Sequence, residues 1–359
     1  MRILHLQTEL NLSCGVTRTI SHIIKNSSAE FEHHLIALGG DGLQRFCNLK
    51  VTPIIIKQSR YSFLGASPLF FFLLNYCKKH SIQIIHSHHR YFDTLAWFLK
   101  TFMVVKTITS VQSKVYGKKR FSYKADKLIA CSNTIKRHLI KNFNIAENKI
   151  IVIFNTVDPS YKNINIDKHR LKIQLGISPD DFIVGFVGRI KYSEKGIDVL
   201  LEAFNHLSKS DLQVCLLIVG DGQDHKELEN YCSVNRLKIL FLTSKENIFE
   251  FYHLMDLVVL PSRIEPFGIV VIEAGLMQKP IIGSNVDGIA EIIRHEIDGL
   301  LFESENVDEL KTNMERIIND KYLANTLAEN LYRKVIESYT VDKIIPEYEK
   351  LYLDVLSKN

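Results

Sequence analysis

Cysteine is scarce in this sequence, and its placement excludes several kinds of site. No cysteine belongs to a CxxC pair or to a cysteine and histidine spacing that holds zinc. The six residues are Cys14, Cys47, Cys77, Cys131, Cys215 and Cys232. Because they are scattered, they favour a reducing compartment, and we expect the protein in the cytoplasm.

The sequence also lacks a long apolar run. Its most apolar helical segment, "SPLFFFLLNYC" at residues 67–77, is well short of the roughly 20 apolar residues that span a bilayer. The first residues, "MRILHLQTEL", read as a strand and lack the order of a signal peptide. We therefore expect neither export nor a membrane span.

The sequence also lacks a strong excess of positive or negative charge. Its formal net charge is only +5, which argues against nucleic acid as the main partner. The basic residues are uneven, however, and between 100 and 141 Asp126 is the only acid. The basic residues there include Lys114, Lys118, Lys119, Arg120 and Lys124. Two interpretations stay open: an ordinary solvated face, or a surface that lies on anionic lipid at the inner face of the cytoplasmic membrane.

Several catalytic motifs are missing as well. The sequence contains no GxGxxG fingerprint, Walker loop, nucleophile elbow or DxD acidic pair. These absences argue against a dinucleotide cofactor and against a metal held on a nucleotide. We expect any catalysis to be electrostatic, with no cofactor and no metal.

What the sequence does contain is an α/β pattern. Short β-branched and apolar runs alternate with segments of helical periodicity, as in parallel sheets covered by helices on both faces. A chain of 359 residues that is 46% hydrophobic can build two cores, and the polar stretch 155–170 predicts a linker. We predict two Rossmann-like doubly wound domains, 1–162 and 163–340, facing each other across a cleft. The strands predicted in the first domain are 2–7, 33–38, 52–56, 82–88, 104–109, 127–132 and 150–155.

In open α/β sheets, ligands bind at the carboxyl ends of the strands, so the residues after each strand are the candidates for a site. Gly15 follows the first strand and precedes a helix, where its backbone can approach a phosphate, although an ordinary loop glycine fits equally. Arg189 and Lys195 flank a strand-to-helix loop in the second domain. Two cations at that place can neutralise a diphosphate.

Two carboxylates flank the apolar stretch "EPFGIVVIE". Pro266 and Gly268 exclude a regular helix around Glu265, so we expect that residue in a tight loop, with the amides of Phe267, Gly268 and Ile269 directed at a ligand. Glu273 follows one turn into a buried helix. A carboxylate beside amides can bind sugar hydroxyls, and the second can bind two hydroxyls of a ribose. The alternatives are a helix N-terminal charge for Glu265 and an exposed helix residue for Glu273.

Three histidines, His86, His88 and His89, lie close together in the sequence and raise the question of a metal site. Strand alternation puts His86 and His88 of "IIHSHHRYFD" on one face and His89 on the other, with no cysteine nearby. We therefore do not predict a metal here. A hydrogen bond to a substrate and a satisfied interior position both remain open for these side chains.

Taken together, "GRIKYSEKG", "VGDG", "DLVVLPSRIEPFGIVVIEAGLMQKPIIGS" and "DGIAEIIRHEIDGLL" closely resemble the C-terminal domain of the family 4 retaining glycosyltransferases of GT-B fold. The resemblance is specific over residues 182–303 and extends in outline over the whole chain. It implies transfer of a hexose or related sugar from a UDP- or GDP-sugar to a lipid-linked or polysaccharide acceptor, with retained configuration.

The resemblance also implies roles for individual residues. Arg189 and Lys195 would hold the donor diphosphate, together with the Gly15 loop. The donor sugar would contact Glu265 and the following residues Pro266, Phe267, Gly268 and Ile269. Glu273 would hold the ribose, and the last helix, 341–359, would pack back on the N-terminal domain. Because Pro346 interrupts its periodicity, we expect a kink near Ile345.

This chain departs from the family pattern in three places. Thr109 stands where members often carry a histidine, and we expect His88, His89 or Thr109 to contact the acceptor or the sugar. Cys14 and Gly15 replace the usual glycine pair, and Asp287 replaces a usual glycine. Two alternative functions stay open. One is a non-catalytic partner subunit of the same fold, which only Thr109 supports; the other is an enzyme similar to phosphorylases or sucrose synthase on the same fold.

Overall fold

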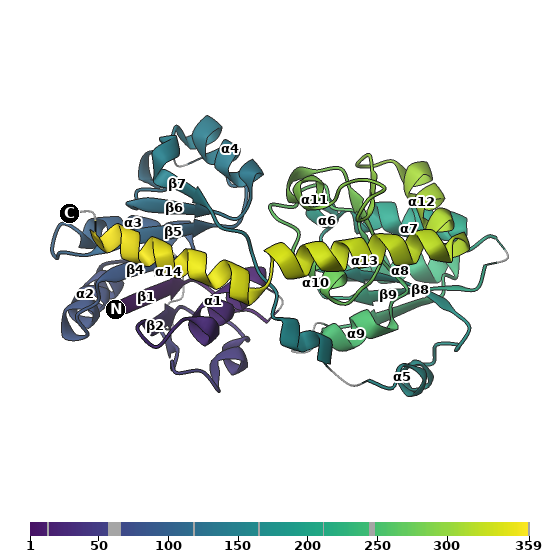
Figure 1. Cartoon of the computed structure of the whole chain (residues 1–359), viewed down its shortest axis with the longest axis horizontal. Coiled ribbons are helices and arrows are strands. Elements are labelled where there is room, and N and C mark those ends of the chain that lie inside the picture. The colour runs from purple at the N-terminus through teal and green to yellow at the C-terminus, as the bar shows by residue number, and fades with distance from the viewer. Residues whose placement is uncertain are drawn as a thin grey trace. The chain divides into compact units, whose positions relative to one another are not determined.

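The computed structural model describes residues 1–12, 14–56, 66–117, 119–163, 166–210, 212–243 and 248–357. The chain forms two compact units, shown in Figure 1. Unit 1 comprises Met1–Thr156 and Val341–Asn359, and unit 2 comprises Val157–Thr340. The sequence-based boundaries were residues 162 and 340.

Unit 1 is built on a parallel sheet of seven strands in the order β3-β2-β1-β4-β5-β6-β7. The order reverses direction between β1 and β4, which are therefore the topological switch point of this sheet. The strands are β1 (Arg2–Gln7), β2 (Glu32–Ala37), β3 (Ile54–Ile55), β4 (Ile84–Ser87), β5 (Lys106–Val111), β6 (Lys127–Ala130) and β7 (Ile150–Val152). Each of the seven overlaps a strand that the sequence predicted.

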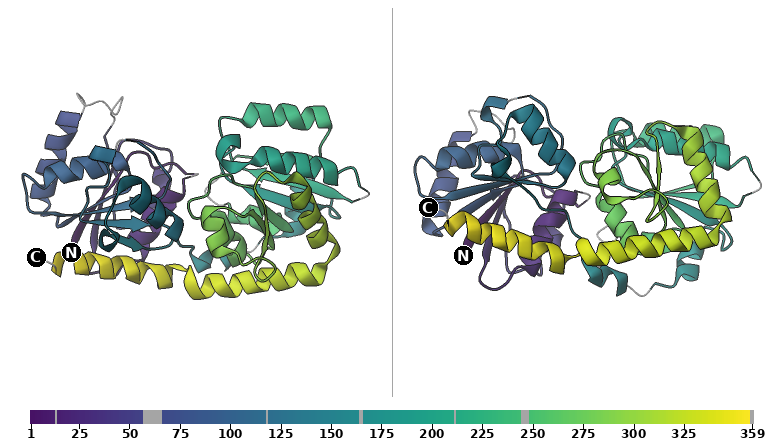
Figure 2. Two further views of the ribbon diagram at one scale, coloured as in Figure 1. Left: turned by 90° about the horizontal axis from the view of Figure 1, so that it is seen from above. Right: turned by 45° about the horizontal axis from the view of Figure 1, so that its top comes forward.

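Helices cover both faces of this sheet because alternate strand residues point to opposite sides. Ile3, Ile84 and Ile108 pack under α14 (Val341–Ser357), which lies beside α1 (Gly15–Asn26). Leu4 and Ile85 point the other way, toward α2 (Ala66–Lys79) and α3 (Arg90–Leu99). The left view of Figure 2 shows α14 in yellow and α2 in blue on opposite sides of the strands. The remaining helices of unit 1 are α4 (Asn133–Phe143) and the 3-10 turns η1 (Leu43–Phe46), η2 (Lys119–Phe121) and η3 (Glu147–Lys149).

Unit 2 repeats the plan with six parallel strands in the order β10-β9-β8-β11-β12-β13. Its switch point lies between β8 and β11, which pair in parallel through Leu257 and Val184. The strands are β8 (Phe182–Val187), β9 (Val214–Val219), β10 (Ile239–Leu242), β11 (Leu257–Leu260), β12 (Ile281–Ser284) and β13 (Leu300–Phe302).

The helices of unit 2 enclose a large apolar core. Alternate residues of β8, such as Val184 and Phe186, join a cluster with α7 and α12, and α10 packs against α13. The helices are α5 (Lys168–Gln174), α6 (Tyr192–Lys195), α7 (Ile197–Leu207), α8 (His225–Asn235), α9 (Phe249–Leu254), α10 (Ile269–Leu276), α11 (Asp287–Ile292), α12 (Val307–Asn319) and α13 (Lys321–Ser338), with the 3-10 turn η4 (Pro159–Asn163).

The predicted fold class is confirmed: each unit is a parallel sheet covered by helices on both faces. One local difference concerns the stretch 155–170, expected to be an irregular linker. It holds η4 and the first turn of α5, whose N-cap Asp167 accepts a hydrogen bond from the Arg170 amide. Side-chain capping, rather than apolar periodicity, starts that helix. Pro346 lies within α14 near its beginning, and the helix runs on through it.

Candidate active site

The strongest candidate site lies at the switch point of unit 2. Arg189 follows the end of β8 and Glu265 follows the end of β11, and these two strands are neighbours in the sheet. Residues far apart in the sequence therefore meet at one edge, where open α/β sheets bind their ligands.

Lys195 and Glu265 form an ion pair at this edge. Lys195 Nζ lies 2.5 Å from Glu265 Oε2, and the same carboxylate oxygen accepts a hydrogen bond from Ser262 Oγ at 3.2 Å. The two charged side chains are only 15% and 11% exposed. In such a poorly solvated place, each charge depends on the other, and removal of one partner costs about 3–5 kcal/mol.

Arg189, the second predicted diphosphate cation, is also paired with a carboxylate. Its Nη2 lies 3.0 Å from Glu194 Oε2, while the other oxygen of Glu194 pairs with Lys191. The Arg189 side chain is 58% exposed, so this pair is weak and easily exchanged. These ion pairs thus join three cations, Arg189, Lys191 and Lys195, to two carboxylates, Glu194 and Glu265.

The loop that carries Glu265 is held by the beginning of α11. The Gly288 amide donates to the Glu265 carbonyl at 2.9 Å, and the Glu265 amide donates to Asp287 Oδ2 at 3.3 Å. A side chain at Gly288 would collide with the Phe267 backbone. Asp287 has a φ of +43°, which explains why a glycine suits this position. Gly268 has a φ of +97° and leads into α10 at Ile269, so Glu265 to Gly268 form the tight loop that the sequence predicts.

Glu273 is buried within α10 and is 1% exposed, which rules out the alternative of an exposed helix residue. Its Oε2 accepts a hydrogen bond from Tyr252 Oη at 2.8 Å. Tyr252 is also fully buried, at the end of α9. A buried carboxylate needs such a partner, and here the phenol fixes its orientation.

The other predicted site residues belong to unit 1. Gly15 is the first residue of α1, the helix that follows β1 in the chain. Thr19 Oγ1 lies 3.1 Å from the Gly15 carbonyl oxygen and 3.1 Å from Asn155 Oδ1, and these two acceptors share its single hydroxyl hydrogen. The predicted place of Gly15, between a strand and a helix, is therefore present in the structure.

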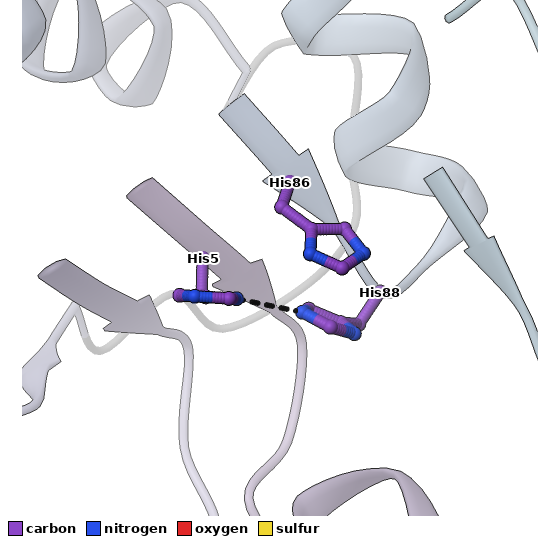
Figure 3. Close-up of side chains that lie close together, drawn as sticks. All are labelled: His5, His86 and His88. Atoms are coloured by element: carbon purple, nitrogen blue, oxygen red, sulfur yellow. Dashed lines mark hydrogen bonds between the residues drawn. The ribbon is translucent and has the colours of Figure 1, made fainter. Parts of the chain in front are cut away.

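Three buried histidines lie together at the end of β1 and β4, as Figure 3 shows. His5 and His86 are opposite one another in the register of these strands, and His88 follows two residues later. His5 Nδ1 lies 3.0 Å from His88 Nε2, and His5 Nε2 lies 2.9 Å from His33 Nδ1. Burial lowers the pKa of His88 to about 3 and that of His33 to about 4, so both rings are neutral near pH 7.

His86 is held separately by side chains of β5 and α14. Its Nδ1 lies 2.9 Å from Tyr352 Oη and its Nε2 lies 2.8 Å from Ser110 Oγ. The ligand atoms of His5, His86 and His88 are within 4.8 Å of one another, close enough for a metal ion to be considered. Both ring nitrogens of His5 and of His86 already have partners, however, and a metal would have to replace one of these bonds in each ring.

His89 and Thr109 have partners within unit 1. His89 caps α3, because its Nδ1 accepts a hydrogen bond from the Tyr91 amide at 3.1 Å. Thr109 donates its hydroxyl hydrogen to Asp93 Oδ1 at 2.7 Å. Asp93 also accepts from the Lys124 amide, and its burial raises its pKa. The roles predicted for His88, His89 and Thr109 toward an acceptor or sugar stay predictions.

Sequence reasoning missed three residues of these sites. His5 was not singled out, although "RILHLQ" and "IQIIHSH" carry histidines that pair in register once β1 and β4 are neighbours. Tyr252 was overlooked because its link to Glu273 spans 21 residues and two elements. Arg263 sits inside the quoted motif, but its partners come from distant segments.

Two glycosyltransferase family profiles match this chain. The sequence profile of the family described as "Glycosyl transferases group 1" matches residues 167–334, and that of "Glycosyltransferase Family 4" matches residues 14–161. Together the two matches cover most of both units.

Curated relatives and solved structures include other glycosyltransferases. The uncharacterized glycosyltransferase MJ1607 of Methanocaldococcus jannaschii is 31% identical over 238 residues, 64% of this chain and 60% of the relative. The UDP-Gal:alpha-D-GlcNAc-diphosphoundecaprenol alpha-1,3-galactosyltransferase of Escherichia coli is 30% identical over 236 residues, 64% of this chain and 60% of the relative. The matched region thus spans less than two thirds of each relative.

Among solved structures, Anabaena HepE in complex with UDP and glucose superimposes with a TM-score of 0.86 at 21% identity, covering 100% of both chains. At this identity, the likeness shows the fold. With the two family matches, it leads to one conclusion: the chain belongs to the family 4 glycosyltransferases of GT-B fold.

Proposed function

We propose that this chain is a retaining glycosyltransferase that moves a hexose or related sugar from a UDP- or GDP-sugar to a lipid-linked or polysaccharide acceptor of a cell-surface glycan. The observation that carries the proposal is the Lys195–Glu265 pair at the switch point of unit 2, with Arg189 on the same loop as Lys195. The cations suit a diphosphate and the carboxylate suits sugar hydroxyls. The E. coli relative, named for a UDP-galactose donor and a diphosphoundecaprenol acceptor, supports the substrate class.

The proposed reaction breaks the bond between the anomeric carbon of the sugar and the β-phosphate oxygen. The electron pair of that bond stays on the diphosphate, where Lys195 and Arg189 stabilise the growing negative charge. The acceptor oxygen attacks the anomeric carbon from the same face and gives its proton to the departing phosphate oxygen. The configuration is therefore retained, and the protein's own cations do the work for which other transferases use a metal.

The carboxylates have separate duties in this scheme. Glu265 accepts hydrogen bonds from the donor sugar, and Lys195 balances its charge until the diphosphate arrives. Glu273, oriented by Tyr252, accepts hydrogen bonds from the ribose. Gly15 completes the scheme as a backbone contact for phosphate at the N-terminus of α1.

We also propose that the enzyme works at the cytoplasmic face of a membrane. No described helix is long and apolar enough to cross a bilayer. Support comes from exposed aromatic side chains that accompany the basic residues: Phe121, whose ring lies 5.8 Å from the Arg120 guanidinium carbon, and Trp97 and Phe98 at the end of α3. Aromatic rings and cations together favour an anionic lipid surface. The other residues of the predicted basic surface are Lys114, Lys119 and Lys124, while Lys118 lies outside the described residues.

A thermal-shift screen tests the proposed function. Purified protein is heated with UDP, GDP and ADP and with their sugars, and the melting temperature is recorded. Because a ligand that binds only the folded state raises the unfolding temperature, we expect one nucleotide diphosphate and its sugar to give the largest shift. Absence of a shift with every nucleotide would refute the proposal.

A further inference from the structure

Arg263 joins the two loops that carry the candidate site. It lies between the end of β11 and Glu265, and its amide donates to the Glu194 carbonyl at 2.8 Å. The amide of Ile264 donates to the same carbonyl at 3.1 Å. Glu194 directly precedes Lys195, so the backbone of one loop lies against the backbone of the other.

The side chain of Arg263 binds two further segments, at Asp198 and Glu305, and also Tyr192 in the same helix as Glu194. Its Nη1 and Nη2 form a fork with the two oxygens of Asp198 at 2.6 and 2.7 Å. Its Nε and Nη2 form a second fork with Glu305, the latter bond at 2.7 Å. Nη1 also donates to the carbonyl of Tyr192. These bonds use every N–H donor of the guanidinium group.

Two residues that the Arg263 side chain binds, Tyr192 and Asp198, lie on either side of Lys195 in the sequence. Tyr192 begins α6, Lys195 ends it, and Asp198 lies in the first turn of α7. Between them, Gly196 has a φ of +58° and lies so close to the Pro261 carbonyl that a Cβ would be 2.0 Å from that oxygen. Arg263 therefore holds the chain on both sides of Lys195 against the strand end that leads to Glu265.

Two carboxylates occupy the guanidinium, and the Arg263 side chain is only 22% exposed. Its charge is already balanced, and it has no N–H left for a phosphate. Arg263 therefore fixes the geometry of the two loops and does not attract the donor by its charge.

We propose that Arg263 is a positioning residue of the donor site, which holds Lys195 at the distance from Glu265 that a nucleotide diphosphate requires. This inference rests on the proposed function. It predicts selective weakening of diphosphate binding when the two forks are lost, while the nucleoside part of the ligand binds as before. Lysine cannot replace arginine here, because an ammonium group cannot form two planar forks.

The test compares Kd values for UDP and UMP, or for the di- and monophosphate of whichever nucleoside stabilises the wild type, by isothermal titration calorimetry. We expect Arg263→Lys and Arg263→Gln to weaken UDP about tenfold or more, with UMP within about twofold of the wild type. Asp198→Asn removes one fork without touching Arg263, and we expect the same selective loss. The matched control is Arg316→Gln on α12, which breaks the exposed pair with Glu296 and should change neither Kd.

The outcomes separate this inference from the proposed function. A wild type that binds none of UDP, GDP and ADP contradicts the proposed function and the inference with it. If the wild type binds UDP and Arg263→Lys equals it, or if Arg263→Gln and Asp198→Asn weaken UDP and UMP by the same factor, only the positioning role is overturned. Circular dichroism shows whether each variant is folded. If Arg263→Gln does not fold, Asp198→Asn provides the test in its place.

Discussion

Lys195 and Glu265 are 70 residues apart in the sequence, yet their side-chain atoms Nζ and Oε2 are 2.5 Å apart in the structure. They meet because β8 and β11 are neighbours at the switch point of unit 2. The lysine is therefore already neutralised by a carboxylate. A diphosphate that binds Lys195 has to compete with Glu265, and this competition gives the two residues opposite effects on nucleotide binding.

Substitution of each partner should separate these effects. We expect Lys195→Gln to weaken UDP binding about tenfold or more, since a charge-assisted bond to phosphate is lost. Glu265→Gln removes the competing carboxylate, so UDP should bind as tightly as in the wild type or more tightly. Titration calorimetry measures both, with Glu315→Gln, from a half-buried pair with Lys311, as the control. Equal weakening by both substitutions would contradict the competition.

Tyr252 and Glu273 give a prediction about stability. Tyr252→Phe removes the phenol that donates to the buried Glu273, and we expect a loss of about 1–3 kcal/mol in the free energy of unfolding. Urea denaturation measures this, and Tyr322→Phe, at a side chain that is 83% exposed, should change it little. If Tyr252→Phe is as stable as the control, the phenol does not support the carboxylate.

Asp287 gives a prediction about backbone strain. With a φ of +43°, it occupies a region that costs a residue with a Cβ about 1 kcal/mol, and its carboxylate accepts a hydrogen bond from the Glu265 amide. We expect Asp287→Ala to be less stable than the wild type by about 1–2 kcal/mol, because it keeps the strain and loses the bond. Asp287→Gly relieves the strain and should be more stable than the alanine variant in the same urea experiment. The reverse order would refute this account.

The buried histidines predict a dependence of stability on pH. In the folded protein, burial holds the pKa of His88 at about 3 and that of His33 at about 4, whereas the unfolded value is about 6.5. Below pH 6.5 the unfolded state therefore binds more protons, and stability falls as the pH is lowered from about 6.5 toward 4.

His88→Gln tests this dependence. We expect the variant to lower the slope of unfolding free energy against pH by about 1 kcal/mol per pH unit over that range. His169→Gln, at a histidine on α5 in unit 2, is the control. Identical slopes for wild type and His88→Gln would show that His88 does not stay neutral in the folded protein.

The membrane proposal is tested by charge reversal. We expect substitution of Lys118, Lys119 and Arg120 by glutamate to lower sedimentation with vesicles that contain anionic lipid, since each basic residue near such a surface contributes about 1 kcal/mol. Vesicles of neutral lipid are the control for non-specific adsorption. Unchanged sedimentation with anionic vesicles would refute a role for this surface.

Much of the fold was predictable because parallel sheets leave a strong local signal. The buried strand "RILHLQ", for example, is a short apolar run before a segment of helical periodicity, and it lies where the sequence places it. The tight loop from Glu265 to Gly268 was also predictable locally, because Pro266 and Gly268 exclude a regular helix there.

The partners of the site residues were harder to predict, because they depend on strand order. Nothing local in "GRIKYSEKG" shows that Lys195 meets Glu265 or that Arg263 binds Asp198. The contact between His5 and His88 likewise exists only because β4 lies beside β1 in the sheet, although β2 and β3 separate them in the sequence. Side chains on segments far apart in the sequence become neighbours through the crossover connections, which a single sequence does not display.

The most direct test of the central claim is donor hydrolysis followed by proton NMR. The nucleotide sugar that stabilises the protein is incubated with wild type and with Glu265→Gln, each in the presence of EDTA. We predict that the wild type releases sugar whose anomeric configuration is that of the donor, at a rate that EDTA does not change, and that Glu265→Gln is slower by about 100-fold or more. Inverted sugar, or equal rates for the wild type and Glu265→Gln, would contradict the account.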